Sequence, residues 1–96
     1  MVTVDDFYTP SAGEVMSQTR DFKQWCETNE VSYSGNFTSW KDCVFLIQED
    51  TEVKVFARVG ANEWELLETE EFAEKSEALK WYRGVMTGSR NPLDLL

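Results

Sequence analysis

The sequence predicts an α+β fold in which an antiparallel sheet of three to five strands carries an N-terminal and a C-terminal helix packed on one face. Apolar residues recur with helical spacing near both ends of the chain, and the central runs either alternate in polarity or are continuously apolar. Short polar turns separate these runs. The chain has 96 residues, the size of one domain, so we expect residues 1–96 to form a single α+β domain.

The N-terminal helix is expected over residues 11–28. Ser11 and Glu14 have the spacing of a capping box, in which the two side chains satisfy backbone N–H groups at the start of a helix. Apolar residues then follow at i, i+7 and i+11, which places them on one stripe of an amphipathic helix. This stripe consists of Val15, Phe22 and Cys26.

The centre of the chain is expected to form strands. The stretch 43–47 is continuously apolar, as in a strand buried on both sides, whereas residues 52–59 and the start of 63–68 alternate in polarity. Because the connections between these three runs are short, an antiparallel meander is the natural pairing. Two shorter runs, 31–33 and 37–40, are further strand candidates.

The last long element is expected to be a helix. Thr69 and Ser76 are its two candidate N-caps, and Gly88 is the candidate C′ residue. The apolar tail 93–96 should dock on the body or on a partner. With both helices on one face, the other face of the sheet would be exposed, and we expect function there. The predicted helix stripe consists of Phe72, Ala78, Leu79, Tyr82, Val85 and Met86.

The charge balance excludes whole classes of function. The chain has 18 acidic residues, 9 basic residues and no histidine, which gives a net charge of −9. Nucleic-acid binders need clustered lysine and arginine, and anionic membranes attract the same residues. We therefore expect no direct nucleic-acid binding and no membrane association. Without a membrane-length apolar run or the features of a signal peptide, the expected location is cytoplasmic.

Residues typical of catalytic and metal sites are sparse. Near neutral pH, general acid–base chemistry most often uses histidine, which is absent, and the glycines are too scattered for a phosphate loop. Cys26 and Cys43 are expected to be reduced thiols. Glu49, Asp50 and Glu52 share one turn but lack EF-hand spacing, so we interpret them as a solvated hairpin turn. We expect no catalytic residue, no cofactor and no metal; a small enzyme built on a carboxylate pair is the least favoured hypothesis.

Glutamates are concentrated between residues 63 and 77. Seven glutamates and one lysine give this stretch a charge of −6, two-thirds of the net charge. If the segment after the last strand is helical, Glu70, Glu74 and Glu77 fall at i, i+4 and i+7 on one stripe. Two interpretations stay open: a solvated acidic surface that favours solubility, or a surface that steers the chain onto a basic partner.

Tryptophan supplies the second unusual feature, because anchors at protein interfaces are often tryptophan or tyrosine. Trp64 lies inside the glutamate-rich stretch, and Trp81 lies at the edge of the predicted helix stripe, so both are candidate anchors. The candidate partner-binding residues are Glu63, Trp64, Glu65, Glu68, Glu70, Glu71, Glu74, Glu77 and Trp81.

In size, acidity, absence of histidine and lack of a catalytic signature, the chain resembles phage- or plasmid-encoded inhibitors, which include nucleic-acid mimics and anti-CRISPR proteins. The resemblance is one of composition. It implies a small acidic protein-binding module that blocks a basic, nucleic-acid-binding surface of a host protein. The alternative is a self-associating accessory protein of a larger assembly, with a homodimer held by the exposed sheet face and the 93–96 tail.

Overall fold

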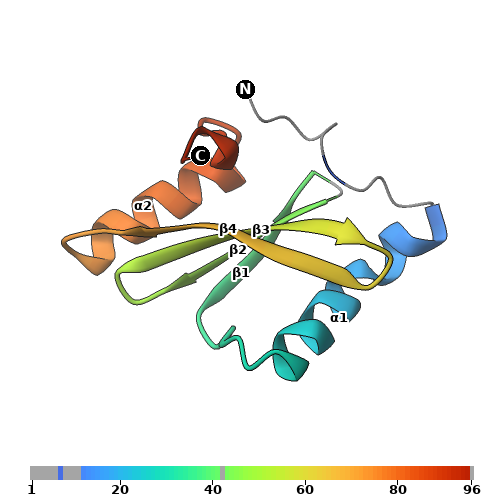
Figure 1. The fold of residues 1–96 in the computed structure, drawn as a ribbon. Helices are drawn as coiled ribbons and strands as arrows, with labels where there is room; N and C mark the ends of the chain where they lie inside the picture. The colour runs from blue at the N-terminus through green and yellow to red at the C-terminus, as the bar shows by residue number, and fades with distance from the viewer. Residues whose placement is uncertain (1–6, 8–11, 42, 96) are drawn as a thin grey trace.

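The computed structural model describes residues 7, 12–41 and 43–95 of the chain. The predicted α+β fold, which consists of an antiparallel sheet, an N-terminal helix and a C-terminal helix, is confirmed (Figure 1). The predicted capping box depends on Ser11, which lies outside the described residues. In chain order the elements are α1 (Ala12–Thr28), β1 (Asn36–Trp40), β2 (Val44–Glu49), β3 (Glu52–Gly60), β4 (Glu63–Glu71), α2 (Lys75–Met86) and the short 3-10 helix η2 (Pro92–Leu95).

Strands β2, β3 and β4 form the predicted meander, and β1, which the sequence offered as a strand candidate, extends it to the order β1-β2-β3-β4 with every neighbouring pair antiparallel. The predicted strand at 31–33 is absent. The backbone N–H of Val31 donates to the Cys26 carbonyl at 2.8 Å, which closes the end of α1. The hydroxyls of Ser32 and Ser34 donate to the carboxylate of Glu49, so this segment is held by side chains rather than by a strand ladder, and these bonds lower the pKa of Glu49.

The two helices lie on opposite faces of the sheet, so the expectation that both pack on one face was wrong (Figure 1). Successive side chains of a strand point to opposite faces. In β2, Val44 and Leu46 pack with α2, whereas Phe45 and Ile47 pack with α1. The physical reason is that β2 is apolar on both sides, and each apolar face needs a covering helix.

The face covered by α1 has an aromatic core. Phe22 of α1 is fully buried and stacks on Phe45 with the ring centroids 4.5 Å apart. Phe56 and Trp64 meet Phe22 edge-on, an arrangement that aromatic rings favour. The members of this α1-side core are Phe22, Cys26, Phe45, Ile47, Phe56 and Trp64.

The face covered by α2 has a mainly aliphatic core. Ala78, Tyr82 and Val85 supply the buried side of α2, as predicted, but Met86 is 59% exposed. Phe72 precedes the helix and packs against this core from the connection. The α2-side core comprises Cys43, Val44, Leu46, Val53, Val55, Ala78, Tyr82, Val85 and Leu93.

The ends of α2 combine one wrong prediction with two confirmed ones. Its N-cap is Glu74 rather than Thr69 or Ser76, because the chain before it stays in the sheet. Gly88, with φ of 85°, follows the C-cap as predicted. Leu93 is 6% exposed in the α2-side core, so this part of the tail docks on the body. Within the described residues, no helix combines the length and the apolar character that a bilayer crossing needs.

Candidate protein-binding surface

Strand β4 forms one edge of the sheet. We use the term acidic row for the seven glutamates between residues 63 and 77, most of which lie on β4. Glu65 pairs with Ala57, and Ala57 pairs in turn with Val44 of the α2-side core. Glu65 therefore lies on the α2 side of the sheet. A bulge at Leu67 then shifts the register, so that Glu68 pairs with Val55. A one-residue shift moves the following side chains to the other face.

The bulge therefore gathers glutamates that simple alternation would separate. Glu63 and Glu65 share one face by their spacing, and the bulge brings Glu68 and Glu70 to that same α2 side. Helix α2 packs mainly against β1, β2 and β3, and Leu67 of β4 packs against the α2-side core, so the glutamates share this face of β4 with one half-buried apolar side chain. Glu63 and Glu65 are exposed, and Glu68 and Glu70 are half-buried.

The carboxylates of the acidic row are not neutralised by basic side chains. Among the described residues, which include every lysine and arginine of the chain, the ion pair within 4 Å joins Arg20 and Asp21 on α1. Glu68 instead accepts a hydrogen bond from the Thr69 backbone N–H at 3.0 Å. The row therefore projects negative charge into solvent.

The predicted helical stripe of Glu70, Glu74 and Glu77 was wrong. Pairing of β3 with β4 continues as far as Glu71, and the next backbone N–H donates to the Thr51 carbonyl at 2.8 Å. This pairing keeps Glu70 in the sheet. Helix α2 begins only after Glu74, so Glu77 is the member of the row that lies in its first turn, where the helix dipole favours anions.

Strand pairing also adds an acid that the sequence did not place beside the row. Glu52 of β3 lies directly opposite Glu71, and like charges at such positions repel. Its neighbours in sequence, Glu49 and Asp50, belong to the adjoining hairpin. No group of three described acidic or cysteine side chains has an arrangement that could hold a metal ion.

The two predicted tryptophan anchors have different positions. Trp64 is 4% exposed in the α1-side core, with the Arg58 guanidinium 5.1 Å from its ring, so it is not available as a surface anchor. Trp81 is half-buried and packs beside Phe72. The exposed apolar side chain on β4 is Leu66, at 47% exposure. The sequence already indicated that Trp64 and Leu66, two residues apart in a strand, share one face opposite Glu63 and Glu65. Only the position of α1 shows that Trp64 is covered and that Leu66 is not.

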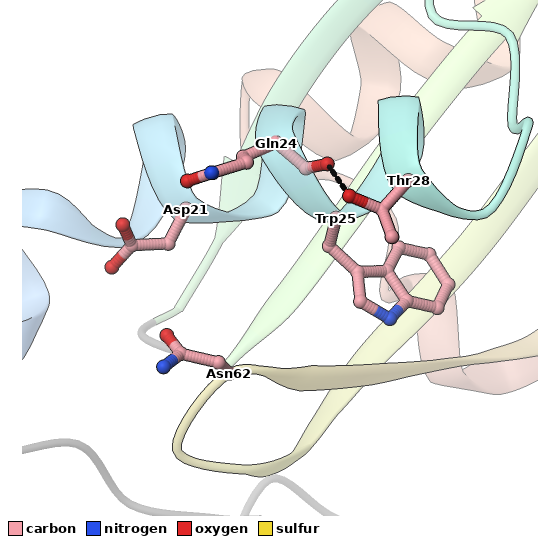
Figure 2. Close-up of a pocket in the computed structure, with 5 residues that line it drawn as sticks. All are labelled: Asp21, Gln24, Trp25, Thr28 and Asn62. Carbon is pink, nitrogen blue, oxygen red and sulfur yellow. Dashed lines mark hydrogen bonds between the residues drawn. The ribbon is translucent and has the colours of Figure 1, made fainter.

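A hollow of about 350 Å³ lies between α1 and the turn that joins β3 to β4 (Figure 2). We call it the hairpin hollow. Its lining consists of one carboxylate, two amides, a hydroxyl and an indole, and Asn62 reaches it from the hairpin turn. The lining residues are Asp21, Gln24, Trp25, Thr28 and Asn62.

Both cysteines are buried, and they lie in different cores, Cys26 under α1 and Cys43 under α2. Burial raises the pKa of the Cys26 thiol to about 11, and the neighbouring Glu27 carboxylate acts in the same direction. A thiol that stays protonated is a poor nucleophile near neutral pH.

The raised pKa of Cys26 predicts a loss of stability in alkali. Because the folded-state pKa of about 11 lies above the ordinary value of 9.0, this thiol contributes its full stabilisation below pH 9. The contribution is then lost progressively as the pH rises from 9 to about 11. Urea unfolding across this range should show a steeper decline for the wild type than for Cys26→Ala. Equal slopes for the two proteins would contradict this expectation.

Together these features define a class: an α+β domain with helices on both faces of its sheet and an acidic, unneutralised edge strand. Comparison with protein-family models, with curated protein sequences and with solved structures found no match to this chain.

Proposed function

We propose that this protein is a binding module that docks its acidic row onto a basic surface of a partner protein. The observation that carries the proposal is the exposed edge strand β4, whose carboxylates have no lysine or arginine of the described chain within 4 Å. Charge left unpaired on one strand creates a directional field. Such a field raises the rate of encounter with a basic surface.

The shape of the acidic row suits a groove that normally holds nucleic acid. From Glu63 to Glu71 the strand extends over about 26 Å, at about 3.3 Å per residue. Duplex DNA presents a comparable line of negative charge. We therefore propose that the partner surface is a nucleic-acid-binding one, and that the module blocks it in the manner of an inhibitor.

Leu66 supplies the apolar contact that the buried Trp64 does not. It is 47% exposed and projects on the α1 side of β4, opposite Glu65 and Glu68. Interfaces need a desolvated apolar centre in addition to a charged rim. A basic partner would meet carboxylates on one side of this strand and an aliphatic group on the other.

Self-association receives less support from the same observations. Pairing of two β4 edges would bring glutamates of both copies together, which is a recognised protection against edge-to-edge association. Of the tail that could hold a dimer, Leu93 is buried in its own chain. The expected homodimer also needs one sheet face without a helix, whereas α1 and α2 pack on opposite faces.

The test is affinity capture from a lysate of the producing cells, at low and at high salt, with three proteins. The wild type is compared with Glu71→Lys/Glu74→Lys and with Glu30→Lys/Asp94→Lys. All four substituted residues are exposed, and both variants change the net charge equally. We expect a partner that the wild type and the Glu30/Asp94 variant retain at low salt, that high salt releases, and that duplex DNA displaces.

The Glu71/Glu74 variant should lose this partner. Equal retention by both variants would show that total charge, rather than the acidic row, controls binding. Retention that neither salt nor duplex DNA reduces would contradict a basic nucleic-acid-binding partner surface.

A further inference from the structure

The hairpin hollow is built by one face of α1 and one turn of the sheet. Its four α1 residues are spaced at i, i+3, i+4 and i+7, which brings their side chains together on the helix surface (Figure 2). The turn opposite is held by Arg58, whose guanidinium donates to the carbonyls of Gly60 (3.1 Å) and Ala61. Both walls therefore belong to ordered parts of the fold.

The polar groups of the hollow have unused hydrogen-bonding capacity. The side-chain amides of Gln24 and Asn62 make no hydrogen bond with the described chain. The Thr28 hydroxyl donates its proton to the Gln24 carbonyl at 3.0 Å, so only its acceptor lone pairs face outward (Figure 2). Asp21 accepts one bond from Ser17 at 3.1 Å and pairs with the exposed Arg20 at 3.7 Å, and each carboxylate oxygen keeps a further lone pair.

Trp25 provides a fixed aromatic wall. Its indole is half-buried, stacks near Phe22 at 5.9 Å and meets Phe56 edge-on at the same distance. These contacts hold the ring in place against the core. A preorganised ring can bind a flat apolar surface with little loss of side-chain entropy.

We propose that the hairpin hollow binds a saccharide ring. Each sugar hydroxyl both donates and accepts, which matches amides that do both and a carboxylate that accepts. The C–H groups on one side of a sugar ring can pack against an indole. The volume of about 350 Å³ lies at the low end for ligand sites and suits a single ring.

The charge of the lining argues against an anionic ligand. Asp21 is the charged residue of the lining, and the chain as a whole carries −9. An ammonium ligand would suit Asp21 and Trp25 but would make no use of the donor N–H groups of Gln24 and Asn62, which would stay bonded to water. A neutral polyhydroxyl ring uses all of these groups. The site is independent of the acidic row, most of which lies on the other side of the sheet.

The test is titration of the full chain followed by ¹H–¹⁵N spectra, with the Trp25 indole signal assigned from Trp25→Phe. The probes are glucose, galactose, mannose and N-acetylglucosamine, with choline and adenosine monophosphate as charged comparators. We expect one monosaccharide to shift the Trp25 signal at millimolar concentration. Asn62→Ala and Gln24→Ala should each weaken binding about 3- to 10-fold, the value of one hydrogen bond.

Asn29→Ala is the matched control. It also removes an exposed side-chain amide near the end of α1, but this amide donates to the Trp25 carbonyl and does not line the hollow. It should leave the affinity unchanged. A trisaccharide that binds more tightly than its monosaccharide would identify the end of a glycan as the source, and equal binding would identify a free sugar. The proposal is overturned if no saccharide binds, if choline or adenosine monophosphate shifts Trp25 instead, or if Asn62→Ala and Gln24→Ala bind like the wild type.

Discussion

Replacing Phe22 with alanine should lower the free energy of unfolding by about 3–5 kcal/mol, as large-to-small aromatic substitutions do in well-packed cores. Phe22 is fully buried and contacts the rings of Phe37, Phe45, Phe56 and Trp64. Its removal opens a cavity that rings on several elements cannot fill together. Urea unfolding followed by tryptophan fluorescence measures the change.

Two controls separate the cavity from a general effect of substitution. Phe22→Leu keeps most of the volume and should cost less than the alanine variant. Met86→Ala removes a large apolar side chain that is 59% exposed, so it should change stability by no more than about 0.5 kcal/mol. A loss below about 1 kcal/mol for Phe22→Ala would mean that α1 does not depend on this aromatic core.

Reversal of two charges in the acidic row should slow association with the partner by about 10- to 100-fold at low salt. The variant is Glu71→Lys/Glu74→Lys, which reverses the field at the end of the row where Glu52 lies opposite Glu71. Steering acts mainly on the association rate, so the dissociation rate should change less. The salt dependence of the association rate should also become flatter, since fewer attractive charges remain to be screened.

Stopped-flow or biosensor kinetics over a range of salt concentrations measure this effect. The Glu30→Lys/Asp94→Lys variant has the same net charge and should associate at close to the wild-type rate. If both variants slow association equally, position on β4 is irrelevant and the net charge alone is responsible. An unchanged rate for Glu71→Lys/Glu74→Lys at low salt would contradict steering by the acidic row.

Much of the fold follows from local patterns in the sequence. The alternation over residues 52–59 predicted β3 to within one residue, because period-two patterning indicates a strand with one buried face. The continuous apolar run at 43–47 predicted β2, because a short run of this kind is typical of a strand buried on both faces. Short turns between runs left an antiparallel meander as the simple pairing. Gly88 marked the end of α2, since a left-handed conformation there favours glycine.

Other features depend on contacts between distant residues. The 31–33 segment has strand-like composition, but Ser32 and Ser34 bond the Glu49 side chain on another element. Likewise, the seven-residue spacing from Phe72 to Met86 implied an earlier helix start. Pairing of Glu71 with Glu52 keeps the chain in the sheet instead, and helix propensity is too weak to compete with a paired strand.

The candidate site likewise combines features that were visible in the sequence with features that depend on strand pairing. The density of glutamates between residues 63 and 77 was visible in the sequence and directed attention to β4. The bulge at Leu67 and the cross-strand position of Glu52 were not, since both are properties of strand pairing. Trp64 looked like an anchor because tryptophan is common at interfaces, yet α1 covers it and leaves Leu66 outside.

The sequence by itself determined the class of fold, the order of most elements and the segment that carries the charge, because these depend on spacing and composition within short stretches. Only the tertiary structure decided that α1 and α2 lie on opposite faces, that four glutamates share one side of β4, and that a hollow forms beside Asn62. Each of these requires residues far apart in the chain to meet. The packing of both apolar faces of β2 and the register of β3 against β4 determine which distant residues come into contact.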